Sequence, residues 1–306
     1  MRLAEPAQRG LVIDWRTSVV WSQIMLLTFV GLTFDLRCDD DTRRRLEHEW
    51  PEFLARELST SPNVIVDARR VEALDEPVES TDVVVARTGS SWCFQRRDFT
   101  LHWSPSSREG TLSYTRPFSL TAALRVLLAM ALRSEGGVLF HASSVRVADE
   151  ALVFPGVSGS GKTTVATLAA PRGVLSDEIT GVRIEGDRIM VHPTPFWGDM
   201  PRTRAADAAP LQAIVLLERG APPSLGPAVS GVALATLLEA ALLFDTEVAG
   251  REDKSALVDL LGHIVARAPC RRLRYALPAN PWELLDGGDA RTNGRTDEER
   301  SMSATN

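Results

Sequence analysis

The chain has 306 residues, and its content of 44% hydrophobic and 24% charged residues is typical of a globular protein. A net charge of -6 argues against nucleic acid or an anionic membrane as a bulk partner. The three cysteines, Cys38, Cys93 and Cys270, are far apart and odd in number, which argues against a disulfide framework and a Cys-x-x-Cys metal site and favours a reducing cytoplasm.

Residues 1–24 are predicted to be a non-native or flexible extension. The apolar stretch 19–34 contains polar residues and is shorter than a membrane span, which requires about 20 residues. It lacks a basic start immediately before it and a small-residue cleavage site, so a signal peptide is not expected. The simpler interpretation is that Met25 is the physiological start and that residues 26–38 form a first β-strand.

Residues 25–115 are predicted to form a small α+β module. A helix is expected to begin at the acidic run 39–41, which precedes apolar positions at Leu46, Trp50 and Leu54. β-Branched and alternating runs predict strands within 63–71, 82–87, 91–104 and 111–116.

Residues 116–286 are predicted to form a second domain of mixed strands and helices, followed by a disordered polar tail at 287–306. A helix over 119–137 places leucines on one stripe and ends in two glycines. Strand-like runs then dominate, with two further helices before a last strand. The predicted strands are 138–147, 150–156, 181–193, 211–219 and 270–277, and the predicted helices are 231–244 and 254–268.

A glycine-rich run, FPGVSGSGKTT at 154–164, matches the G-x-x-x-x-G-K-[ST] phosphate-binding pattern and lies between an apolar strand and a helix beginning. Lys162 is one of only two lysines among 34 basic residues, which makes a chance match improbable. Its compact ammonium would reach the β- and γ-phosphates, and the Thr163 hydroxyl would coordinate Mg²⁺. The predicted nucleotide-binding residues are Gly156, Val157, Ser158, Gly159, Ser160, Gly161, Lys162, Thr163 and Thr164.

Two neighbouring carboxylates and a histidine flank this run in the sequence. Asp177 and Glu178 follow a short apolar stretch, where they could hold a metal ion or accept a proton from a hydroxyl, although an acidic turn would look the same. His141 follows an apolar strand, and a single histidine in that place is more often structural than functional.

Taken together, residues 140–178 resemble the nucleotide site of HPr kinase/phosphorylase and of the ATP-dependent phosphoenolpyruvate carboxykinases. The resemblance is strongest to the HPr-kinase-like proteins of natural-product clusters, including those that phosphorylate a serine of a lasso-peptide precursor. It rests on HASSV, GVSGSGKTT, SDE, PTPFWGD and LQAIVLLERG, and it covers about 120–285 well and 25–115 loosely. It implies an α/β fold with the P-loop core of mixed strands and helices found in this family, plus the small N-terminal α+β module.

The resemblance also implies roles for individual residues. Lys162 and Thr163 take the phosphate and Mg²⁺ roles, Asp177 is base or metal ligand, Glu178 supports it, and His141 lies beside the transferring phosphate or a metal. The HPr kinases have Asp-Asp where this chain has Asp177 and Glu178, and the carboxykinases have a further Asp in place of Ser176. The role of Asp177 therefore stays open between base and metal ligand.

A long proline-rich connector, 193–210, carries Arg202 and Arg204. It is predicted to cover the acceptor site, with one arginine neutralising phosphate charge, or else to be a solvated surface loop. Phe196 and Trp197 within it are expected to anchor the loop in the core rather than to close over a substrate.

The sequence therefore predicts an ATP-dependent serine kinase that uses Mg²⁺ or Mn²⁺. Its acceptor would be a peptide or protein, and the resemblance points to a ribosomal natural-product precursor. The alternatives are a small-molecule metabolite kinase on the same scaffold and a non-catalytic nucleotide-sensing module. We expect a cytoplasmic protein with no nucleic-acid or membrane partner, and the oligomeric state stays open.

Overall fold

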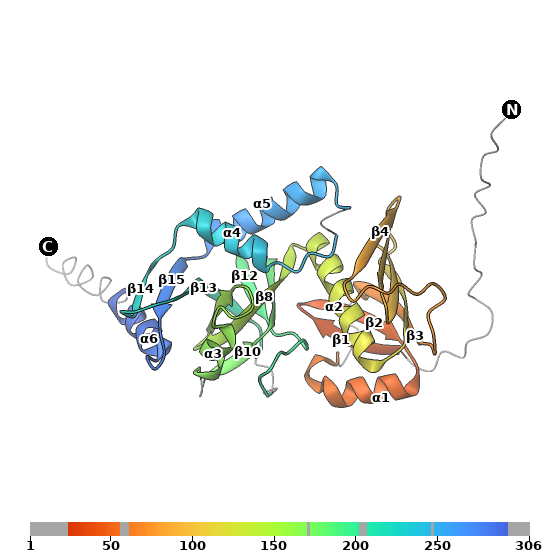
Figure 1. Ribbon diagram of the computed structural model, residues 1–306, viewed down its shortest axis with the longest axis horizontal. Helices are drawn as coiled ribbons and strands as arrows, with labels where there is room; N and C mark the ends of the chain where they lie inside the picture. Colours follow the sequence, from red (N-terminus) through yellow and green to blue (C-terminus); the bar gives the residue numbers. More distant parts are fainter. Residues whose placement is uncertain (1–23, 56–60, 170–171, 202–206, 246–247, 293–306) are drawn as a thin grey trace, which may run out of the picture.

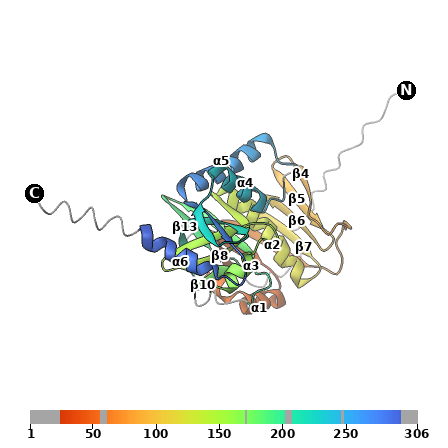
Figure 2. The ribbon, with the colours of Figure 1, turned by 60° about the vertical axis from the view of Figure 1, so that its left-hand side comes forward.

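The computed structural model describes residues 24–292 except 56–60, 170–171, 202–206 and 246–247. The described residues form two mixed β-sheets and several helices, which confirms the predicted mixed α/β architecture. The two sheets lie side by side with helix α2 between them (Figures 1 and 2).

The first sheet has the strand order β1-β2-β3-β7-β6-β5-β4. β3 pairs in parallel with β2 and with β7, and the other pairs are antiparallel. Helix α1 (Asp40–Glu49) and the short helix η1 (Pro51–Phe53) follow β2, and the Asp39 side chain caps α1 by accepting a 2.8 Å hydrogen bond from the Thr42 N–H. The strands are β1 (Ile24–Phe29), β2 (Leu32–Arg37), β3 (Val64–Arg70), β4 (Val84–Thr88), β5 (Ser91–Arg96), β6 (Phe99–Ser104) and β7 (Glu109–Tyr114).

The prediction of one strand over 26–38 was wrong, because the chain reverses at Val30 and Gly31 to form the β1–β2 hairpin. Both turn residues have positive φ angles, 51° and 72°. Val30 is an uncommon residue for that conformation, and its side chain is buried against Gly181 of the second sheet. The turn was therefore hidden in a continuous apolar run.

Helix α2 (Pro117–Ser134) is the core element between the sheets. It is long and apolar enough to cross a membrane by length and composition, but 67% of its apolar window is buried inside the protein. Its side chains share one hydrophobic cluster with the first sheet and with Leu139, Ile179 and Phe196 of the second half. The helix is thus explained by packing between two sheets.

The second sheet has the order β10-β8-β11-β12-β13-β15-β14, and β9 pairs with both β8 and β13. Because β9 pairs with both β8 and β13, five strands close into a ring, in the order β8, β11, β12, β13 and β9. The strands are β8 (Gly137–Val147), β9 (Glu150–Pro155), β10 (Gly173–Ser176), β11 (Ile179–Glu185), β12 (Arg188–His192), β13 (Ala209–Arg219), β14 (Ser224–Pro227) and β15 (Cys270–Tyr275).

Helices cover this sheet on both sides. α4 (Ser230–Ala240) and α5 (Arg251–Arg267) pack together on one face (Figure 1), and α3 (Lys162–Thr167) and α6 (Pro281–Thr292) pack on the other. The prediction that disorder begins at 287 was wrong for the first residues of that segment, which belong to α6. Trp282 anchors α6 because it is buried and its Nε1 donates a 3.0 Å hydrogen bond to the Val165 carbonyl of α3.

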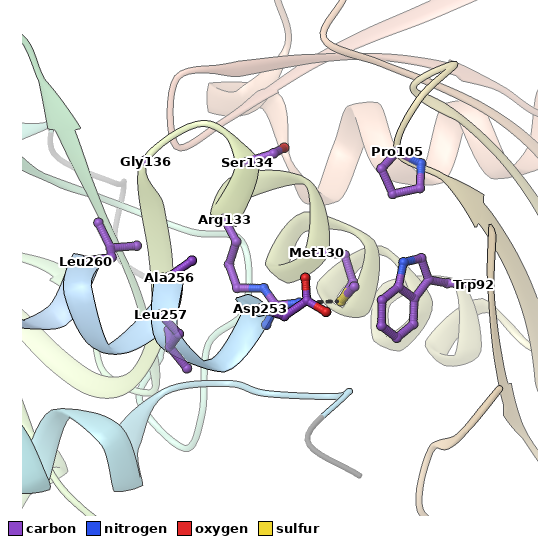
Figure 3. Close-up of a pocket in the computed structure, with 10 residues that line it drawn as sticks. All are labelled: Trp92, Pro105, Met130, Arg133, Ser134, Gly136, Asp253, Ala256, Leu257 and Leu260. Carbon is purple, nitrogen blue, oxygen red and sulfur yellow. Dashed lines mark hydrogen bonds between the residues drawn. The ribbon is translucent and has the colours of Figure 1, made fainter. Parts of the chain in front are cut away.

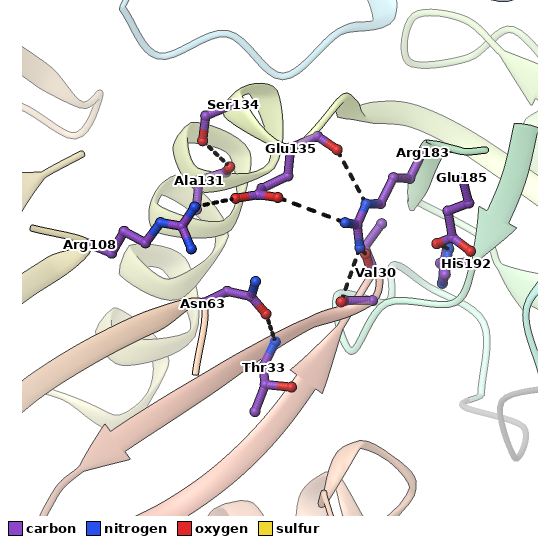
Figure 4. Close-up of polar contacts among 11 residues, drawn as sticks. Val30, Thr33, Asn63, Arg108, Ala131, Ser134, Glu135, Arg183, Glu185 and His192 are labelled. Carbon is purple, nitrogen blue, oxygen red and sulfur yellow. Dashed lines mark hydrogen bonds and ion pairs between the residues drawn. The ribbon is translucent and has the colours of Figure 1, made fainter. Parts of the chain in front are cut away.

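Polar contacts join the two sheets at the β1–β2 turn (Figure 4). Arg183 of β11 donates to the carbonyl of Gly31 at 3.0 Å and to the carbonyl of Glu135 at 3.3 Å. The Glu135 carboxylate in turn pairs with Arg108 at 3.1 Å. These contacts fix the β1–β2 hairpin against the second sheet.

A cavity of about 370 Å³ lies between α2, α5 and strand β5 (Figure 3). Its lining is mostly apolar, with Trp92, Met130 and Leu257 among its residues. The two charged residues in it are paired, Arg133 with Asp245 at 2.6 Å and Asp253 with Arg87 at 3.1 Å. This cavity marks where α5 meets the first sheet.

Candidate active site around the glycine-rich loop

The glycine-rich loop leads from the end of β9 at Pro155 into α3, which begins at Lys162. Gly159 and Gly161 have φ angles of 79° and 105°, a region that side-chain-bearing residues rarely adopt. A Cβ on Gly161 would also lie 3.0 Å from the Tyr275 hydroxyl. The predicted order of strand, glycine loop and helix is therefore present, and the glycines are required by the backbone path.

Lys162 turns back over the loop that precedes it. Its Nζ donates to the carbonyls of Gly156 at 2.7 Å and Val157 at 2.9 Å, and only 6% of the residue is exposed. Burial lowers the pKa of this ammonium, and the nearby Glu178 opposes that shift. The loop thus binds the buried ammonium of Lys162 through its own backbone carbonyls.

Strand β8 brings the loop and the acidic residues together. The His141 carbonyl accepts a hydrogen bond from the Gly156 N–H at 3.2 Å, and the Ala142 N–H donates to the Glu178 carbonyl at 2.9 Å. The Ser143 hydroxyl donates to the Lys162 carbonyl at 3.1 Å. Three consecutive β8 residues therefore contact the loop, the acidic pair and the start of α3.

His141, the acidic pair and part of the glycine loop line one open cleft of about 420 Å³, which we call the central cleft. It brings together most of the site residues predicted from the sequence, and it adds three residues that the sequence reasoning missed: Gly198, Asp199 and Arg219. Its lining is His141, Ser158, Gly159, Gly161, Lys162, Thr163, Thr164, Asp177, Glu178, Gly198, Asp199 and Arg219.

The two carboxylates have different surroundings. Asp177 is 2% exposed, and its two oxygens accept the backbone N–H groups of Gly198 at 2.9 Å and Met200 at 3.0 Å. Glu178 is half-buried and places Oε1 4.0 Å from His141 Nε2. Asp177 therefore anchors the 198–200 segment, and Glu178 presents its carboxylate to the central cleft.

Burial controls the charge of the groups around Glu178. Burial raises the pKa of Glu178. The positive charges of Arg125 and Lys162 oppose this rise, and the negative charges of Asp177 and Asp199 add to it. Burial also lowers the pKa of His141, and the positive charges of Lys162 and Arg125 lower it further. Burial and the two nearby cations therefore disfavour the protonated form of the His141 imidazole.

Arg219 lies at the end of β13, beside the loop, and its guanidinium donates to the Gly159 carbonyl. β13 pairs in parallel with β9, so the carboxyl ends of both strands reach the same edge of the sheet. Arg219 could have been found from the sequence, because it ends the apolar strand predicted at 211–219 and ligands of parallel strands bind beyond their carboxyl ends.

Not every predicted residue is placed in the cleft. Gly156, Val157 and Ser160 belong to the loop but do not line the cleft, and Val157 points outward with 59% of its surface exposed. Arg202 and Arg204 lie outside the described residues. Phe196 is buried at 2% exposure against Phe29 and Trp50, as the anchoring role requires.

The donor set of the cleft suits Mg²⁺. Within the part of the chain that the structure describes, no group of three or more His, Cys, Asp and Glu residues is arranged to hold a metal. Mg²⁺ does not need such a cage, because it usually keeps several waters and binds one or two carboxylates together with substrate phosphates. The Thr163 hydroxyl and the carboxylates of Asp177 and Glu178 supply the hard oxygen donors that it prefers.

Comparison with known proteins identifies no family for this chain. No protein-family model matches it, and no curated protein matches its sequence. Among solved structures, the Hpr(Ser) kinase/phosphatase from Coxiella burnetii is similar with 7% sequence identity and a TM-score of 0.31, over 51% of this chain and 98% of that chain. A likeness of this degree carries no argument about activity, so the function has to be argued from the central cleft.

Proposed function

We propose that the protein is an ATP-dependent phosphotransferase that moves the γ-phosphate to a serine hydroxyl of a peptide or protein. The observation that carries this proposal is the central cleft, which is lined by a buried lysine of the glycine loop, by two carboxylates and by an imidazole. Phosphoryl transfer needs cations and amides at one end and a proton acceptor at the other, and these groups supply both.

The loop and Lys162 form the nucleotide end of the site. The two hydrogen bonds that Lys162 Nζ now donates to loop carbonyls would be exchanged for bonds to phosphate oxygens. The Ser160 hydroxyl oxygen is buried without a hydrogen-bond partner in the described chain, so the loop also has unused polar capacity. Thr163 and Asp177 would hold Mg²⁺, which supplies charge neutralisation for the phosphate oxygens when bound.

Glu178 is the proton acceptor in this proposal. Both oxygens of Asp177 are engaged by backbone N–H groups, whereas Glu178 is half-buried in the cleft beside His141. The raised pKa of Glu178 brings it closer to the value that suits general-base catalysis near neutral pH. The serine oxygen bonds to the γ-phosphorus, its proton passes to Glu178, the bond to the β–γ bridging oxygen breaks, and ADP leaves.

The open side of the cleft favours a macromolecular acceptor. The loop, Asp199 and Arg219 border the cleft, so a serine on an extended peptide segment could reach Glu178 from solvent. The acceptor that agrees with the sequence resemblance is a ribosomal natural-product precursor, and we propose that class first.

Intact-mass spectrometry tests this function. The purified protein is incubated with ATP and Mg²⁺ and with candidate precursor peptides that contain serine, and we expect a gain of one phosphate on serine. Lys162→Met should abolish the gain while keeping the volume of the side-chain stem. Lys254→Met is the matched control, because Lys254 is the other lysine and is exposed on α5.

The outcomes separate the alternatives. Transfer that persists in Lys162→Met would refute the site assignment. Turnover of ATP on small hydroxyl compounds with no peptide product would identify a metabolite kinase. Binding of ATP with no transfer to any acceptor would identify a nucleotide-sensing module.

A further inference from the structure

Arg219 lines the central cleft, and its charge has no carboxylate partner among the described residues. It is the last residue of β13, it is exposed, and its guanidinium donates a hydrogen bond to the Gly159 carbonyl of the glycine loop. The neighbouring carboxylate of Glu218 pairs with Arg272 at 3.7 Å and with Arg274 at 3.6 Å. A guanidinium has five N–H donors, so Arg219 can keep its bond to the loop and bind an anion as well.

The strand order places Arg219 on one side of the glycine loop. β10 is antiparallel to β8, and β8 is antiparallel to β9. β9 is parallel to β13, which is parallel to β15. The carboxyl ends of β10, β9, β13 and β15 therefore reach the same edge of the sheet, in that order. Ligands of open α/β sheets bind beyond this edge.

Different groups follow these four strand ends. Asp177 and Glu178 come directly after β10, the glycine loop follows β9, Arg219 ends β13, and Tyr275 ends β15. The Tyr275 hydroxyl donates to the Gly161 carbonyl at 3.5 Å, so β15 also contacts the loop. The loop therefore lies between the acidic pair on one side and Arg219 on the other.

This order gives a direction to a nucleotide on the loop. In the proposed function the acceptor serine meets Glu178 on the β10 side, so the γ-phosphate lies toward that side and the nucleoside toward β13. The α-phosphate carries the nucleoside, and it is then the phosphate group on the side of Arg219. A guanidinium binds phosphate oxygens through two parallel N–H···O bonds, which suits an exposed arginine without an ion pair.

We propose that Arg219 binds the α-phosphate of the nucleotide and thereby marks the nucleoside end of the central cleft. This proposal rests on the proposed phosphotransferase function and adds the orientation of its nucleotide. Lys162 reaches the β- and γ-phosphates from the loop, so the two cations bind different parts of the polyphosphate. ADP and ATP share the α-phosphate, and Arg219 therefore contributes to the affinity for both.

Nucleotides with sulfur at the α-phosphate test this contact without turnover. In ADPαS a sulfur, which accepts hydrogen bonds weakly, replaces one of the two non-bridging α-oxygens, and the two diastereomers replace different oxygens. The Kd values of both diastereomers, of ADP and of ATP are measured by calorimetry with Mg²⁺. The proteins are the unmodified chain, Arg219→Met, Arg219→Lys and Arg272→Met. Arg272→Met is the matched control, because Arg272 is exposed on the neighbouring strand β15 and does not line the cleft.

We expect Arg219→Met to weaken ADP and ATP by the same factor, about ten- to a hundredfold, the range of one hydrogen bond to a charged group. Arg219→Lys should recover part of this affinity. The ratio of the Kd values of the two diastereomers should differ about tenfold between the unmodified protein and Arg219→Met, because the arginine binds one α-oxygen in preference to the other. Arg272→Met should keep the ratio and the affinities of the unmodified protein.

Three results would overturn the proposal. A loss of affinity confined to ATP would place Arg219 at the γ-phosphate, on the acceptor side. An equal loss for ADP and ATP with an unchanged diastereomer ratio would show that Arg219 acts only through the Gly159 carbonyl. Unchanged affinities for both nucleotides would show that Arg219 does not contact them. Arg219→Met is expected to fold, because Arg219 is exposed.

Failure of the proposed function would be recognised separately. If ATP and ADP bind but no peptide is phosphorylated, transfer to peptides is refuted, and the Kd values still decide the role of Arg219. If the unmodified protein binds neither nucleotide, both the proposed function and the role of Arg219 are overturned.

Discussion

Replacement of Asp177 by asparagine should destabilise the folded protein by about 2–4 kcal/mol. The carboxylate is 2% exposed and accepts N–H groups from Gly198 at 2.9 Å and from Met200 at 3.0 Å. A hydrogen bond to a charged group contributes roughly 1.5–3 kcal/mol, and a buried donor left without a partner costs about 1–3 kcal/mol. Asparagine has one acceptor oxygen, so it keeps one bond in neutral form and turns its NH₂ toward the second N–H.

The assay is urea unfolding followed by tryptophan fluorescence, with the midpoint and slope determined for each variant. Asp199→Asn is the control, because Asp199 is an exposed carboxylate on the same segment and should change stability by less than about 0.5 kcal/mol. Glu178→Gln should lose phosphoryl transfer with little change in the urea midpoint. Asp177→Asn should lose phosphoryl transfer and should also unfold at a lower urea concentration. An Asp177→Asn protein as stable as the unmodified one would refute the anchoring of the 198–200 segment by this carboxylate.

Three further predictions concern the fold. Gly181→Ala should cost about 1–3 kcal/mol, because its Cβ would lie 2.4 Å from Val30 Cγ2, and Val30→Ala in the same chain should recover most of the loss in urea unfolding. Trp282→Ala should cost about 3–5 kcal/mol in the same assay, and an unchanged midpoint would show that α6 is dispensable. Burial lowers the pKa of His192 below its ordinary 6.5 despite Glu185, so the unfolded chain takes up the proton first. The contribution of neutral His192 to stability is therefore complete above pH 6.5 and is lost as the pH falls below it. The difference between the unfolding midpoints at pH 7.5 and pH 5.5 should be smaller in His192→Gln than in the unmodified protein.

Most strands and helices could be predicted because their residues carry strong local signals. The 11-residue strand β8 and the 18-residue helix α2 lie where apolar runs and the leucine stripe indicated them. The β1–β2 turn escaped because a buried valine occupies a turn position with positive φ. Helix α6 escaped because its apolar signal is short, with Trp282, Leu284 and Leu285 at the start of a polar, glycine-containing segment.

The glycine loop, by contrast, could be found from sequence alone. Its backbone path needs glycine at particular spacings, and the phosphate-binding pattern places a lysine directly after the last of these glycines. His141, Asp177 and Glu178 were suspected from their proximity in the chain, and the structure places all three on the central cleft. Their roles as phosphate, metal or base groups stay predictions that the experiments above test.

What the sequence determined by itself is therefore local: the order of strand, loop and helix around Lys162, and the types of side chain available beside it. Only the tertiary structure decided that Asp177 holds two backbone N–H groups while the Glu178 carboxylate lies beside His141, because this depends on where the 198–200 segment meets the acidic pair. It likewise placed Phe196 against Phe29 and Trp50, which lie more than a hundred residues earlier in the chain. Contacts between segments far apart in sequence leave no local pattern, since each segment satisfies its own periodicity whatever its neighbour is.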